Sequence, residues 1–164
     1  SENLRHIIVT HSHEDHFETS LFAYRKQCFS KVKPDNVLNI YGGAGVVRKI
    51  NLFAWQSGKN IGFHGDFSCW QMKVHELYPF EPMELPDVDM TIYPLKANHM
   101  AQVSTEEPMI YVIRWGAKYL MIANDTGYFC DENGLVTAAI AMTASLASSA
   151  ALMKILELRG ILSV

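Results

Sequence analysis

Three histidines and one aspartate fall within six residues of the sequence, as His11, His13, Asp15 and His16. Imidazole nitrogens suit zinc, iron or nickel, and a carboxylate beside them extends the range to manganese. A single histidine beside an apolar run is an ordinary core or surface residue, but this grouping of four side chains is far rarer. The cluster therefore predicts a site for metal ions.

The cluster directly follows the apolar run His6-Ile7-Ile8-Val9-Thr10, which predicts a buried strand. Alternate side chains of an extended chain point the same way, so His11 and His13 are expected to face one ion. The chain must then turn, which lets Asp15 and His16 face a second ion. Because four ligands are too few to complete two sites, we expect further ligands from elsewhere in the chain.

Short apolar runs separated by turn residues predict a mixed α/β or α+β fold in a single domain of residues 1–164. The polar stretch 81–87 is expected to be a loop, and residues 116–117 a hairpin turn. The glycine-rich run 42–45 lacks the lysine and hydroxyl residue of a phosphate-binding loop, so it predicts a tight turn. Further strands are expected over 37–41, 72–78, 90–95, 109–115 and 119–123, and helices over 17–28, 46–55 and 135–158.

The composition excludes several classes of protein. With 49% hydrophobic and 19% charged residues, the 164-residue chain is not intrinsically disordered, and its net charge of −3 gives no overall basic field for nucleic acid. The three cysteines form no Cys-x-x-Cys motif, and the first residues lack an apolar signal segment, so we expect reduced thiols and a cytoplasmic protein. The uncharged stretch 135–153 is rich in alanine, serine and threonine, which predicts a packed helix rather than a membrane span.

Three other histidines lie in different surroundings. His6 begins the first predicted strand and His75 lies within another, so both are expected to be structural. His64 lies in a polar, glycine-bearing stretch and is expected to be an ordinary loop residue.

The pattern His11-x-His13-x-Asp15-His16 after a hydrophobic strand and a threonine is similar to the signature of the metallo-β-lactamase-fold hydrolases. A later histidine and a later aspartate of the family pattern are matched by the runs 93–99 and 119–127, and the resemblance covers roughly residues 4 to 130. It implies an αββα sandwich with a metal site at one edge of the sheets.

The resemblance also implies how the ligands divide between two divalent ions, zinc or manganese, with iron as a further option. By it, His11, His13 and His99 would hold one ion. Asp15 and His16 would hold the second.

By the same resemblance, Asp125 would bridge the two ions. Two cations flanking one water would hold a hydroxide at neutral pH. Asp15 would orient this hydroxide or accept its proton, which makes it the expected catalytic residue. Thr10 and Ser12 are near enough in sequence to fix the imidazoles by hydrogen bonds.

The sequence departs from the family pattern in two places. The family has a further histidine after the position of Asp125, but none follows His99 here. It also has a β-hairpin before the first motif, where this sequence has only a few residues. We therefore expect a sandwich that is incomplete at both termini, or a variant with one weakened metal site.

Within the superfamily, the Asp-Thr-Gly at Asp125 and the Pro-Leu-x-Ala-x-His run ending at His99 look most like the phosphodiesterase branch. We expect a metal-dependent hydrolase that uses a metal-bridged hydroxide on a small-molecule phosphodiester or ester, with neither nucleic acid nor a membrane as partner. A homo-oligomer is left open. The alternatives are a hydrolase of thioester, lactone or β-lactam substrates, and a non-catalytic or truncated metal-binding module of the same fold.

Overall fold

The computed structural model describes residues 4–20, 22, 37–56, 71–100 and 105–125. The chain divides into two compact units. Unit 1 contains Ser1–Leu77 and Ala101–Glu107, and unit 2 contains Tyr78–Met100 and Pro108–Val164. Each unit is built around its own sheet, and the two are described in turn.

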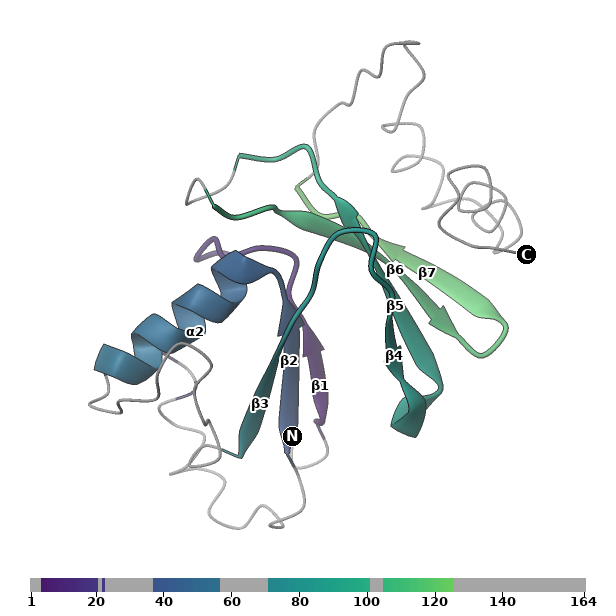
Figure 1. Cartoon of the computed structure of the whole chain (residues 1–164), viewed down its shortest axis with the longest axis horizontal. Helices are drawn as coiled ribbons and strands as arrows, with labels where there is room; N and C mark the ends of the chain where they lie inside the picture. The colour runs from purple at the N-terminus through teal and green to yellow at the C-terminus, as the bar shows by residue number, and fades with distance from the viewer. Residues whose placement is uncertain (1–3, 21, 23–36, 57–70, 101–104, 126–164) are drawn as a thin grey trace. The chain divides into compact units, whose positions relative to one another are not determined.

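Unit 1 contains a parallel sheet with strand order β1-β2-β3 (Figure 1). Helix α2 (Ala44–Gln56) follows β2 and leads to β3, as parallel neighbours require a crossover connection. The backbone pairing continues past the strands, because Val9 donates to the carbonyl of Tyr41 and Leu77 to that of Gly42. The strands are β1 (His6–Ile8), β2 (Leu38–Gly42) and β3 (Met72–Glu76).

Helix α2 packs on one face of this sheet through an apolar stripe (Figure 1). Val46, Ile50 and Ala54 recur at intervals of four residues, which places them on one side of a helix, and none is exposed. They share a core with Leu38 and Ile40 of β2. Burial of this apolar surface therefore holds the helix against the strands.

The carboxyl ends of the three parallel strands meet at one edge of the sheet, and the loops that leave them gather there. The loop after β1 carries His11, and β2 ends at Gly42, just before the turn that leads into α2. A Cβ atom on Gly42 would lie only 2.8 Å from the Cβ of Val46. The tight turn predicted for residues 42–45 is thus confirmed, with glycine required by the close approach of the helix.

Unit 2 contains an antiparallel sheet with strand order β4-β5-β6-β7 (Figure 1). Trp115 pairs with Lys118 around the hairpin turn, where Gly116 has φ of +55°, a left-handed conformation that favours glycine. The strands are β4 (Met83–Leu85), β5 (Met90–Lys96), β6 (Met109–Trp115) and β7 (Lys118–Ile122), with a short 3₁₀ helix, η2 (Pro86–Val88), between the first two.

A proline stands within β5, where strands usually avoid it. Pro94 pairs with Tyr111 of β6, while the carbonyl of Pro94 accepts a hydrogen bond from Phe80 on the other side. Strand β4 pairs only with residues 90–92 of β5. Because the pairing with β4 ends before Pro94, the lack of an N–H on this proline removes no hydrogen bond between β4 and β5.

The mixed helix-and-sheet class predicted from the sequence is confirmed, and most predicted strands agree within two residues. The prediction of a loop over 81–87 is wrong, because residues 83–85 form β4 and 86–88 form a 3₁₀ helix. These elements are too short to produce an apolar period. The predicted helix over 135–158 and His64 lie outside the described residues, as does most of the predicted helix over 17–28. Among the residues described, none of the helices has the length and apolar character needed to cross a membrane.

Candidate metal centre

The loop after β1 places the first histidine of the motif inside unit 1. His11 is 2% exposed, and the neighbouring Val9, Thr10 and Ser12 are also buried. Val9 belongs to the core beneath α2, so the start of the loop is anchored in packed apolar surface. The local sequence explains this, because an apolar strand leads directly into the polar cluster.

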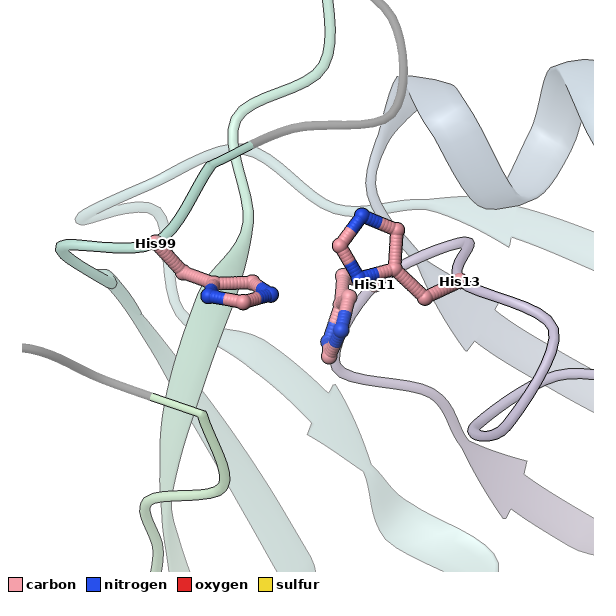
Figure 2. Close-up of side chains that lie close together, drawn as sticks. All are labelled: His11, His13 and His99. Carbon is pink, nitrogen blue, oxygen red and sulfur yellow. The ribbon is translucent and has the colours of Figure 1, made fainter.

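Three histidine rings meet on this loop. The ring of His11 stands edge-on to that of His13, with centroids 4.6 Å apart and planes at 78° (Figure 2). Its centroid is also 4.3 Å from that of His16, with planes at 41°. The ring of His11 therefore contacts two other side chains predicted as metal ligands, His13 and His16, within unit 1.

The chain turns directly after His13, as predicted. The carbonyl of His13 accepts hydrogen bonds from the backbone N–H of His16 (3.1 Å) and of Phe17 (2.8 Å). Phe17 is buried in the core, which fixes the far side of the turn. The side chain of Asp15 is 76% exposed, and its Oδ2 lies 3.5 Å from Nε2 of His16.

A hydroxyl group contacts one of the two ring nitrogens of His11. Thr10 Oγ1 lies 3.0 Å from Nδ1 of His11, and this contact is buried. If Nε2 held a metal ion, Nδ1 would carry the hydrogen and would donate it to the Thr10 hydroxyl. Thr10 therefore fixes the ring that stands at the centre of the histidine contacts.

Unit 2 contributes the two other predicted ligands. His99 follows β5 (Figure 2), and Asp125 follows β7. His99 Nε2 and Asp125 Oδ2 are 4.0 Å apart, and the two side chains are 25% and 41% exposed. Asp125 has φ of +49°, a left-handed conformation that aspartate tolerates better than most residues. The structure thus brings the last histidine and the last aspartate of the motif together at the ends of two strands.

The donor types of these residues fit divalent metal ions. Imidazole nitrogens together with carboxylate oxygens suit zinc, manganese and iron. Asp15 lies beside His16, and its part in binding an ion stays a prediction. A ligand atom that could hold a metal ion is offered by each of His11, His13, His16, His99 and Asp125.

Two residues that contact the loop were not predicted from the sequence. Both oxygens of Glu106 accept hydrogen bonds from Ser12, and Lys49 donates to the Ser12 carbonyl. Glu106 stands in a polar run of the sequence, where no apolar pattern predicts its burial. Lys49 is separated by one helical turn from Gly45, a spacing that indicates a shared helix face but not what lies on it.

Comparisons with known proteins agree with the motif. A family model described as a beta-lactamase superfamily domain matches residues 1–153. No curated protein sequence matches the chain.

Solved structures similar to the chain include unliganded yeast PDE1 and the short form of human tRNase Z. The match to yeast PDE1 has a TM-score of 0.60 at 15% identity, over 88% of this chain and 42% of that one. The match to human tRNase Z has a TM-score of 0.52 at 16% identity, over 87% of this chain and 55% of that one. The chain thus spans about half the length of these relatives.

Proposed function

The chain belongs to the beta-lactamase superfamily, and from this premise we propose that it is a metal-dependent hydrolase of phosphodiesters. The observation that carries the proposal is the contact of the His11 ring with two further histidine rings, those of His13 and His16, on the loop after β1. Side chains with the same charge when protonated gain little from such contact. Imidazoles gathered in this way can instead bind a metal ion together.

The proposed ligand sets follow the family motif. We assign His11, His13 and His99 to one ion, and Asp15 with His16 to a second. Two bound divalent cations would lower the pKa of a water molecule and take up charge on a phosphoryl oxygen. The chain's own contribution is to hold the imidazole nitrogens in place, which the Thr10 hydroxyl does for His11.

Two carboxylates would complete the chemistry. Asp125 is proposed as the ligand shared by both ions, since it lies beside His99 at the end of β7. Asp15 is proposed to orient the attacking water and to accept its proton. Its exposure of 76% supports this role, because a proton acceptor must be reached by water and substrate.

The choice of a phosphodiester rests on sequence. The run that ends at His99 and the Asp-Thr-Gly that begins at Asp125 resemble the phosphodiesterase branch of the superfamily. A net charge of −3 does not favour a long polyanion, so we propose a small substrate rather than nucleic acid. The same ligands could serve thioester, lactone or β-lactam hydrolysis, which the test must therefore include.

The test is hydrolysis of bis(4-nitrophenyl) phosphate by the chain loaded with Zn²⁺ or Mn²⁺, beside thioester, lactone and β-lactam probes. Asp15→Asn should lower kcat for the diester by about 100-fold or more, since a positioned proton acceptor contributes about 10²–10⁴-fold. Glu14→Gln is the matched control, because Glu14 is an exposed acid next to Asp15. It should change kcat by less than about twofold, as exposed substitutions usually do.

Two results would contradict the proposal. Turnover of another probe in place of the diester would overturn the substrate class. Metal-loaded chain without turnover of any probe would favour the non-catalytic metal-binding module.

A further inference from the structure

Ser12, the residue between the first two histidines of the motif, has each of its polar groups engaged. Its backbone N–H donates to Glu106 Oε1 (2.8 Å), and its hydroxyl donates to Glu106 Oε2 (2.6 Å). Its carbonyl accepts a hydrogen bond from Lys49 Nζ (2.8 Å). All of these residues belong to unit 1. Two side chains far away in sequence therefore hold one residue of the loop.

These contacts fix the backbone that joins the two histidines. The N–H of Ser12 lies in the peptide plane that joins it to His11, and its carbonyl lies in the plane that joins it to His13. Glu106 anchors the first plane and Lys49 the second. Since the two planes set the directions of the flanking Cα–Cβ bonds, the contacts set where both imidazoles point.

The Glu106 carboxylate lies in space that is open because residue 45 is a glycine. A Cβ atom on Gly45 would overlap the carboxyl carbon and Oε1 of Glu106, and would lie 2.7 Å from Cγ. Gly45 is the second residue of α2, so the carboxylate lies at the first turn of the helix, where the helix dipole favours a negative charge. This glycine at the start of α2 therefore leaves space for the side chain of Glu106.

Burying the Glu106 carboxylate is energetically unfavourable, which indicates that the carboxylate has a function. Glu106 is only 6% exposed, and a buried carboxylate is unfavourable unless hydrogen bonds replace its water. Here both of its oxygens are bonded to the same serine. A buried carboxylate that bonds to a single loop residue does little for packing. It does fix the position of that residue, which lies between two of the predicted metal ligands.

We propose that Glu106 is a positioning residue for the metal ligands: seated on Gly45, it holds Ser12 and thereby aims His11 and His13. This role rests on the proposed function, because it concerns the binding of metal ions. Lys49 acts with Glu106 by holding the other peptide plane. The proposal also gives Gly45 a role, as the space that the Glu106 carboxylate fills.

The experiment measures Co²⁺ affinity and the visible d–d spectrum of the full chain, with circular dichroism melting in parallel. Glu106→Ala should lower the affinity about 10–100-fold, the usual loss when a ligand's supporting hydrogen bond is removed. Glu106→Gln should restore most of it, because an amide offers one acceptor to the Ser12 N–H and one donor to its hydroxyl. Glu84→Gln is the control, an exposed glutamate on β4 of unit 2.

Gly45→Ala provides an independent test that leaves Glu106 unchanged. Alanine favours a helix more than glycine does, so the substitution should not weaken α2 by itself. It should displace the carboxylate, lower the Co²⁺ affinity as Glu106→Ala does and alter the d–d spectrum. The double variant should be no worse than Glu106→Ala alone, because both changes remove the same contact.

The outcomes separate this inference from the proposed function. Wild-type chain that binds Co²⁺, with Glu106→Ala and Gly45→Ala within about twofold of its affinity, overturns the positioning role alone, even if both variants melt earlier. Wild-type chain that binds no Co²⁺ overturns the proposed function and the positioning role with it. Loss of affinity in both variants, with recovery in Glu106→Gln, is the result that supports the inference.

Discussion

Unit 1 contains two groups of histidines that differ in their structural surroundings. The first, His11, His13 and His16, lies on the loop after β1. The second, His6 and His75, lies within strands β1 and β3, on either side of Tyr41 in β2. Position relative to the strand end separates a group that could bind a metal ion from a group that supports the sheet.

The second group is engaged by its neighbours in the sheet. The ring of Tyr41 stacks on His75, with centroids 4.6 Å apart, and on His6, at 5.8 Å. His6 Nδ1 contacts the Tyr41 hydroxyl at 3.1 Å, and His75 Nε2 contacts Asn39 Oδ1 at 2.9 Å. The structural role predicted for His6 and His75 fits these contacts.

The first group has a different kind of partner. Its hydrogen bonds hold the backbone and orient a ring, as Thr10 does for His11, and the ring of His11 contacts the other two. The comparison teaches that a histidine at the carboxyl end of a parallel strand is presented to a ligand, whereas a histidine inside the strand is used by cross-strand contacts.

The largest effect expected from this comparison concerns Thr10. Thr10→Val keeps the side-chain shape and removes the hydroxyl that contacts His11 Nδ1. The affinity for Zn²⁺ should fall about 10–100-fold, because the ring orientation and the ligating nitrogen are no longer fixed. Competition with a chromophoric chelator measures it. Thr19→Val, at another buried threonine of unit 1, is the control and should keep the wild-type affinity. Equal affinities of all three proteins would break the comparison.

A smaller effect is expected from His75. Burial lowers the pKa of His75 below its ordinary 6.5, and Lys73 and His6 lower it further. The unfolded chain therefore binds more protons than the native one as pH falls through 6.5, and the native state loses stability there. Above the ordinary pKa, this contribution vanishes.

His75→Gln should accordingly reduce the loss of Tm between about pH 7.5 and about pH 5.5, by on the order of a few °C. The measurement uses metal-free protein, so that the ligand histidines do not add a metal-linked term. The variant should also keep the wild-type affinity for Zn²⁺. An unchanged pH dependence of Tm would show that His75 does not titrate differently in the folded chain.

Much of the fold follows from local sequence patterns. The β-branched run at β1, the short apolar run at β2 and the four-residue spacing of Val46, Ile50 and Ala54 predict their elements, because each shows a local hydrophobic pattern. Strand β4 has only three residues, and its pairing with β5 is a tertiary contact that no local pattern contains.

The candidate site divides in the same way. The spacing of His11, His13 and His16 predicts their contact because the three lie on one short loop. The support from Glu106 could not be predicted, since 94 residues separate it from Ser12. The glycine at position 45 is the one trace of it in the sequence, and a turn alone explains that glycine equally well until the space beside it is known.

The most direct test of the central claim is metal content by plasma mass spectrometry, on chain purified without chelator. The wild type is expected to hold about two ions per chain, as a dinuclear hydrolytic centre requires. His13→Ala should lose most of this metal, whereas His75→Ala should keep it. Metal-free wild-type protein, or the same metal content in His13→Ala as in the wild type, would contradict the account.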